Sequence, residues 1–221
     1  QIGSGGTSGA LASNSSNLTV NSGGWLVFNR SDNYGGAITQ SLAGSGSLLL
    51  SSGSLTLGGS NTFSGALNIA SGKSLVVASS LASGAFSGSI SNAGTLTFNS
   101  SASNNLAGVI SGSGSLTQTG TNTLTLGGAN TFTGGLYINA GSVAISSSLN
   151  LGAAANVINL NNAGLFITAG TNISHALNIV GTGSLGVAAN TTAIVSSTLT
   201  SGSLATFGAG TLVLSSANSY G

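Results

Sequence analysis

Residues 124–145 read LTLGGANTFTGGLYINAGSVAI, and no other part of the chain is as informative about the fold. Apolar residues alternate with others in three short runs, at 124–126, 136–138 and 143–145. Alternation with a period of two is typical of a strand that turns one face toward a core. Glycines separate the runs, and glycine accepts the left-handed backbone that sharp corners need. The pattern predicts short strands joined at glycine corners.

Two further copies of this pattern occur, LTLGGSNTFSGALNIASGKSLVV at 55–77 and the partial copy LVLSSANSYG at 212–221. The tripeptide Asn-Thr-Phe at 61–63 returns 69 residues later, at 130–132. Its third form, Asn-Ser-Tyr, comes 88 residues after that. The longer spacing predicts one inserted turn of chain, which we place between Gly186 and Gly210.

The same spacing governs a second motif. Gly-Ser-Gly-Ser-Leu at 44–48 returns at 112–116 and, as Gly-Thr-Gly-Ser-Leu, at 181–185. These offsets define repeat units of about 69 residues, which we predict at 24–93, 94–163 and 164–221.

Strand-like runs recur along the whole chain, mostly 6 to 15 residues apart. They lie near residues 18, 26, 38, 48, 55, 67, 75, 90, 96, 110, 116, 124, 136, 143, 158, 165, 177, 185, 194, 204 and 212. No 3.6-residue periodicity is present, so the chain is expected to be all-β.

Two all-β architectures fit these runs, an antiparallel sandwich or barrel and a parallel β-helix. A sandwich has no need for a 69-residue unit, whereas a solenoid stacks like upon like. We therefore predict a single parallel β-solenoid over residues 1–221, with about 20 residues per coil and about ten or eleven coils. In such a stack Leu55, Leu124 and Leu212 are expected to lie in aligned columns.

The composition restricts the chemistry that the chain can perform. Hydrophobic residues make up 40% of the chain, enough for a continuous core, but charged residues only 1%, as Arg30, Asp32 and Lys73. An ordinary domain carries about 25% charged residues, which keep molecules apart by repulsion. The chain is therefore expected to associate, or to depend on attached glycans for solubility. The absence of cysteine excludes disulfides and thiolate metal sites.

We predict no enzymatic activity and no cofactor or metal. Asp32 is the only side-chain carboxylate, whereas glycoside hydrolysis needs a pair and calcium sites need a cluster. A Ser–His–Asp site would require Asp32 and His175, which the solenoid places about seven coils apart. Two cations do not make a nucleic-acid surface, and no apolar run reaches the roughly 18 residues of a membrane helix.

The candidate site residues are polar or aromatic residues at corners. Asn61, Asn130 and Asn218 occupy one repeat position, where their amides are expected to satisfy corner backbone groups. Phe63, Phe132 and Tyr220 are expected to stack on or cover the same corner. Arg30 and Asp32 are expected to form a local ion pair or, together with an outward Trp25, a contact between subunits. Lys73 is interpreted as a solvated corner residue, and His175 as an outward strand or corner residue with pH sensing as its lesser role.

The stretch GGANTFTGG at 127–135, followed by Asn-Ala-Gly at 139–141, resembles the autotransporter-associated β-strand repeat, also called the passenger-associated repeat. The Gly-Ser-Gly-Ser-Leu segments and the opening nine residues resemble it too. The resemblance implies a right-handed parallel β-helix displayed outside a bacterial cell. It is informative about architecture and much less about activity.

Three functions follow as hypotheses. The first is a structural rod or filament subunit, extracellular or on the bacterial cell surface, whose partners are copies of itself arranged head to tail or laterally. The alternative is a passenger segment of an autotransporter-type adhesin that binds a host or surface ligand, with glycans or a cell surface as partners. The third is ice binding through outward Thr121, Thr123 and Thr125, although the copies do not keep a regular threonine face.

Overall fold

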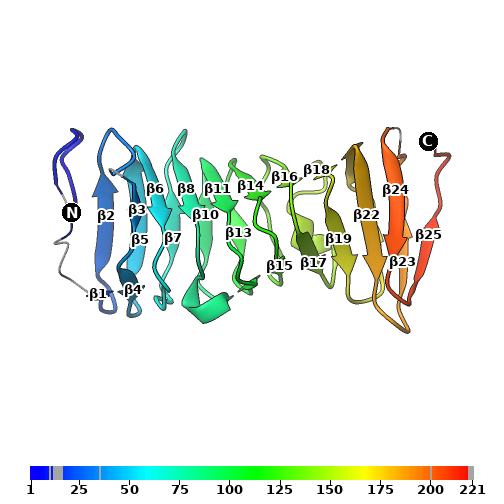
Figure 1. Ribbon diagram of the computed structural model, residues 1–221, viewed down its shortest axis with the longest axis horizontal. Helices are drawn as coiled ribbons and strands as arrows, with labels where there is room; N and C mark the ends of the chain where they lie inside the picture. The colour runs from blue at the N-terminus through cyan, green and yellow to red at the C-terminus, as the bar shows by residue number, and fades with distance from the viewer. Residues whose placement is uncertain (10, 12–16, 35, 200, 219–221) are drawn as a thin grey trace.

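The computed structural model describes residues 1–221 except 10, 12–16, 35, 200 and 219–221. The described residues form an elongated stack of short strands (Figure 1). All strand pairs among them are parallel, and the chain winds through about ten turns. In the described ranges, helix is confined to the short turns η1 (Ala82–Gly84) and η2 (Ser148–Leu151). The predicted parallel β-solenoid is thereby confirmed.

Each turn passes three faces in a fixed order. The first face begins as a two-stranded sheet and continues, through residues 61–63, as a seven-stranded sheet. The link is made by backbone hydrogen bonds from Thr62 to the Leu42 carbonyl (2.7 Å) and from Ser83 to the Asn61 carbonyl (3.2 Å). The strands of the first face are β1 (Asn17–Thr19), β4 (Ser41–Ala43), β9 (Ala85–Phe86), β12 (Asn104–Leu106), β15 (Thr123–Leu126), β17 (Ser142–Ile145), β19 (Gly164–Ile167), β22 (Thr182–Val187) and β24 (Ser203–Phe207).

The second face begins as a five-stranded sheet and ends as a three-stranded sheet, with residues 130–132 and η2 between them. Its strands are β2 (Trp25–Asn29), β5 (Ser47–Ser52), β7 (Leu67–Ile69), β10 (Ile90–Asn92), β13 (Ile110–Ser111), β20 (Thr171–Ile173), β23 (Thr192–Val195) and β25 (Thr211–Leu214). The third face is one eight-stranded sheet. Its strands are β3 (Ala37–Ile38), β6 (Ser54–Leu57), β8 (Ser74–Val77), β11 (Thr95–Phe98), β14 (Ser115–Gln118), β16 (Leu136–Ile138), β18 (Val157–Asn161) and β21 (Ala176–Val180).

The core consists of inward columns, one residue from each coil. One such column, on the third face, pairs in register along the buried residues Leu55, Leu75, Leu96, Leu116, Leu136, Ile158 and Leu177. Strands β6, β8, β11 and β14 share an alternating burial pattern that turns these leucines inward. Burying one such side chain contributes about 1.5–3 kcal/mol, so the period-two pattern of the sequence is what builds the core.

The expectation of aligned leucine columns is wrong for the copies of the repeat. Leu55 lies in β6 on the third face, Leu124 in β15 on the first and Leu212 in β25 on the second. Three in-register pairings, one per coil, connect Leu55 to Leu116. Leu124 follows eight residues later, on the next strand. The first offset therefore spans three coils and one further strand, which rotates the pattern by one face.

The offset from Leu124 to Leu212 follows the same rule with one coil more. Four in-register pairings connect Leu124 to Thr206, and Leu212 lies six residues beyond it, on the next strand. The second interval therefore contains four coils where the first contains three.

Four short strands occur where the sequence predicted none, namely β4, β9, β12 and β20. Within the described part of the chain, no helix has the length and hydropathy that a membrane crossing requires.

Candidate functional site

Asn61 and Asn130 are buried, and each amide connects neighbouring coils. The Asn61 Oδ1 accepts the Leu42 N–H at 3.1 Å, and its Nδ2 donates to Gly59 O at 2.7 Å and to Ser80 O at 3.3 Å. Asn61 therefore bonds to the coil before it and to the coil after it.

The Asn130 Oδ1 accepts the Ile110 N–H at 2.8 Å, and its Nδ2 donates to Asn150 O at 2.6 Å. Backbone groups at corners lack strand partners, and an unpaired buried one is costly. These amides supply the missing partners.

Asn218 makes the same kind of bond on the last described coil. Its Oδ1 accepts the Leu199 N–H at 2.9 Å, and its Nδ2 donates to Ser216 O at 2.8 Å. Asn104, which the sequence analysis missed, does so too, accepting from Leu81 N–H at 3.0 Å and donating to Ala102 O at 3.2 Å. Asn104 shares with the others an apolar residue two positions later, and this Asn-x-apolar spacing is the signal that would have identified it.

The phenylalanines of the same motif lie inside the solenoid. Phe63 and Phe132 are both buried, and the Phe63 ring meets Phe86 edge to face at a centroid distance of 5.4 Å. They fill the core beneath the corner, where edge-to-face packing is favourable. Tyr220 lies outside the described residues.

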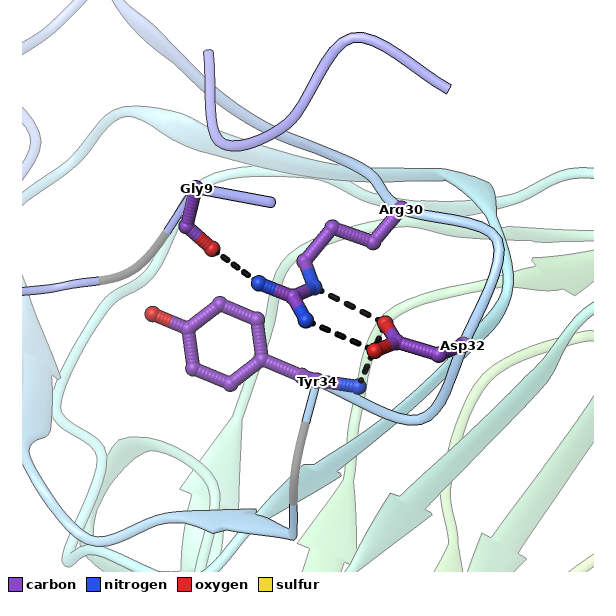
Figure 2. Close-up of polar contacts among 4 residues, drawn as sticks. All are labelled: Gly9, Arg30, Asp32 and Tyr34. Carbon is purple, nitrogen blue, oxygen red and sulfur yellow. Dashed lines mark hydrogen bonds and ion pairs between the residues drawn. The ribbon is translucent and has the colours of Figure 1, made fainter. Parts of the chain in front are cut away.

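Arg30 and Asp32 form a bidentate ion pair just after β2 (Figure 2). The Arg30 Nε donates to Asp32 Oδ1 at 2.8 Å, and its Nη2 donates to Oδ2 at 2.7 Å. The Tyr34 N–H also donates to Oδ1, at 3.2 Å, and the guanidinium lies 5.1 Å from the centre of the Tyr34 ring. The hydrogen bond from Arg30 is the main reason why the pKa of Asp32 falls to about 2, and the same bond raises the pKa of Arg30.

This ion pair also secures the N-terminal segment. The Arg30 Nη1 donates to the carbonyl of Gly9. Ile2 pairs with β2, donating to Val27 O at 2.7 Å and accepting from Asn29 N–H at 2.8 Å. The cluster of Gly9, Arg30, Asp32 and Tyr34 in Figure 2 therefore holds residues 1–9 against the first complete coil. These contacts lie within one chain, and a role between subunits stays a prediction.

The remaining candidates lie apart from one another. Trp25 is 52% exposed at the start of β2. Lys73 is half-buried at the corner between β7 and β8. Thr123 and Thr125 stack on Ser142 and Ala144 in the next coil, so the threonine row ends after one coil.

The prediction of an outward His175 is wrong. Its side chain is only 4% exposed, between β20 and β21, and neither ring nitrogen has a hydrogen-bond partner among the residues that the structure describes. The reason lies in its neighbours, because Ile173, His175 and Leu177 continue one inward alternation around the corner. Asp32 follows β2 near the other end of the stack, so the structure does not bring these two residues together.

The fold and its corners define a class, a parallel β-solenoid whose coils are joined by buried asparagine amides. Comparison with protein families identifies a known repeat within this chain. The passenger-associated-transport-repeat matches residues 50–77, 116–145 and 207–221, so the chain carries this repeat and the predicted resemblance is confirmed. Comparisons with curated proteins and with solved structures gave no match. The repeat and the solenoid together fit a passenger segment of an autotransporter, and the family suggests a secreted or cell-surface location.

Proposed function

We propose that the chain is a segment of an extracellular rod whose work is mechanical and involves no catalysis. The observation that carries this proposal is the single core that continues through about ten turns. Backbone hydrogen bonds on three faces join each coil to the next, so a force along the axis is shared among several bonds at every step. Such a stack serves as a stiff spacer at a cell surface.

Association with further copies is supported by the surface. The chain has only three charged side chains, two of which pair with each other, so repulsion between molecules is weak. Several large apolar side chains are exposed on different faces, among them Trp25, Leu149 and Val180. Lateral contacts between rods would bury them.

The last coil offers a surface for head-to-tail contact. Leu204, Leu212 and Leu214 are only partly buried, and Phe207 is 44% exposed. These side chains line a cavity at the end of the core. Within the described part of the chain, β24 and β25 each have one edge without a partner strand, and such an edge is able to pair with a strand of a second copy.

Sedimentation velocity and electron microscopy over a concentration series test this proposal. The wild-type chain is expected to form rods longer than one molecule as the concentration rises. Leu212→Lys places a charge on the exposed end of the core and should shorten the rods. Thr211→Lys adds the same charge on the outward side of the same strand and is the matched control. Monodisperse single molecules at all concentrations would contradict self-association.

We also propose ligand binding, as in an adhesin passenger, as a second function. The observation that favours it is a polar groove along one edge of the solenoid, lined by successive coil corners. Binding of the purified chain to a glycan array or to cells tests this function independently of filament formation.

A further inference from the structure

A shallow groove follows the corner between the second and third faces. Two adjoining hollows share the corner at residues 72–74 and together form one groove. It is lined by one short segment from each of five successive coils, at 31–33, 52–54, 72–74, 93–95 and 113–115, and it ends at Gly134 and Tyr137. With coils about 4.8 Å apart, five coil steps give a length of about 24 Å. This corner groove is long and open, a shape that suits an extended chain.

At two positions of this corner the neighbouring coils approach each other too closely for a side chain. A Cβ on Gly94 would lie 2.1 Å from the Lys73 carbonyl oxygen, and one on Gly114 would lie 2.2 Å from the Gly94 carbonyl oxygen. Glycine is therefore required at these positions. The corner is therefore hollow at these two positions, whereas Lys73 carries a side chain at the equivalent position of its coil.

One wall of the groove is a column of hydroxyl groups. Ser54, Ser74, Thr95 and Ser115 pair in register on four adjacent strands of the third face, and all four are half-buried. The strands that carry them already bond to neighbouring strands on both sides. A peptide therefore cannot add as an extra strand here, and the hydroxyl groups are what the wall presents to a ligand.

Charge is concentrated in this groove. Asp32 and Lys73, two of the three charged side chains of the chain, both line it. Asp32 is neutralised by Arg30, and because Asp32 is the only side-chain carboxylate, Lys73 is left as a cation without an acidic partner. Lys73 is also absent from the other copy of the repeat, where Gly141 and Ser142 are adjacent, whereas Gly72 and Ser74 flank the lysine. The repeat does not need this residue for its fold.

An exposed aromatic ring lies at the end of the groove that is farthest from Asp32. Tyr137 is 38% exposed on β16 and lines the last section of the groove. A tyrosine ring offers an apolar face and a polar tip, which suits a ligand that is partly apolar and rich in hydroxyl groups.

We propose that the corner groove binds a linear polysaccharide of low charge density that carries carboxylate groups. This inference rests on the proposed ligand-binding function and names its site and ligand class. The hydroxyl column donates to and accepts from sugar hydroxyls, the Lys73 ammonium binds one carboxylate, and the Tyr137 ring packs against the apolar face of a sugar. A densely sulfated chain does not fit, because it needs clustered cations and the groove has one.

The test is a binding titration of the whole chain with a hyaluronan decasaccharide, which carries one carboxylate per disaccharide, and with a neutral dextran oligosaccharide of equal length. Hyaluronan is expected to bind more tightly than dextran. Lys73→Gln is expected to weaken hyaluronan binding about tenfold and to leave dextran binding unchanged. Tyr137→Ala is expected to weaken both several-fold.

Trp25→Ala is the matched control, because it removes an exposed aromatic ring outside the groove. Equal affinity for the two oligosaccharides, or variants at Lys73 and Tyr137 that bind as the wild type does, would overturn the groove assignment while ligand binding elsewhere still stood. A wild-type chain that binds neither these probes nor a glycan array nor cells would remove both the site and the ligand-binding function. Circular dichroism of each variant verifies that it folds.

Discussion

Replacement of Asn130 by alanine removes a bridge between three coils without disturbing the alternation of any strand. Asn130 is 5% exposed, accepts the Ile110 N–H at 2.8 Å and donates to the Asn150 carbonyl at 2.6 Å. Alanine can form neither bond. Both backbone groups are then left without this partner, in a place that water does not readily reach.

The cost follows from these two groups. A buried polar group that loses its partner costs about 1–3 kcal/mol, so the two together give about 2–6 kcal/mol. A carbonyl tolerates the loss of one partner better than an N–H does. We therefore expect Asn130→Ala to lower the free energy of unfolding by about 2–4 kcal/mol.

Urea unfolding measures the total effect, and residue-resolved hydrogen exchange locates it. Because a repeat stack can unfold in parts, exchange at the Ile110 amide is the more direct measurement, and its protection should fall. Asn105→Ala is the control, since Asn105 is an exposed asparagine on β12, and it should cost less than about 0.5 kcal/mol. Equal effects of the two substitutions would refute the idea that buried amides hold the corners together.

Three further outcomes are expected. The pKa of Asp32 is lowered from 3.8 to about 2, chiefly by its hydrogen bond to Arg30, so the stability from this pair is complete above pH 3.8 and disappears as the pH falls through about 2. Melting temperatures of the wild type should fall over that interval, whereas those of Asp32→Asn should not. Leu96→Ala, in the fully buried column of the third face, should cost about 2–5 kcal/mol in urea unfolding. Gly94→Ala places a Cβ 2.1 Å from a carbonyl oxygen and should cost about 1–3 kcal/mol, whereas Gly6→Ala, where a Cβ meets open space, should have little effect in the same assay.

The sequence was sufficient to predict those strands in which apolar and polar residues alternate over about four positions or more. The runs at Leu75, Leu96 and Leu116 each became a strand with its leucine inward. Glycine corners and a long repeat then favoured a parallel coil over an antiparallel sandwich, because a coil accommodates a repeated pattern in successive turns, although the equivalent strands of the copies lie on different faces. Fold class therefore followed from local chemistry together with the repeat.

The short strands β4, β9, β12 and β20 could not be predicted in this way. They contain two or three residues each, too few for an alternation to stand out. Their extended conformation comes from pairing with the strand above or below, which is a property of the stack. Asn104 was missed for the same reason, because it lies in one of them.

The error at His175 has a different origin. Its polarity suggested an exposed position, but the alternation of Ile173, His175 and Leu177 continues inward around the corner. Here the pattern was a better guide than the residue type. Histidine generally prefers partly exposed sites. Here that preference did not outweigh the inward alternation set by the apolar residues two positions before and after it.

The rotation of the repeat by one face has a consequence for function. A surface feature repeated in every copy would wind around the rod, since Leu55 and Leu124 lie on different faces. A continuous straight surface must therefore be built from successive coils, whatever repeat they belong to. The corner groove is such a surface: its segments at 31–33, 72–74 and 113–115 follow from coil stacking and not from the 69-residue unit. Lys73 lies in one copy only, so substitutions in the groove can change binding while the repeated pattern that forms the fold stays intact.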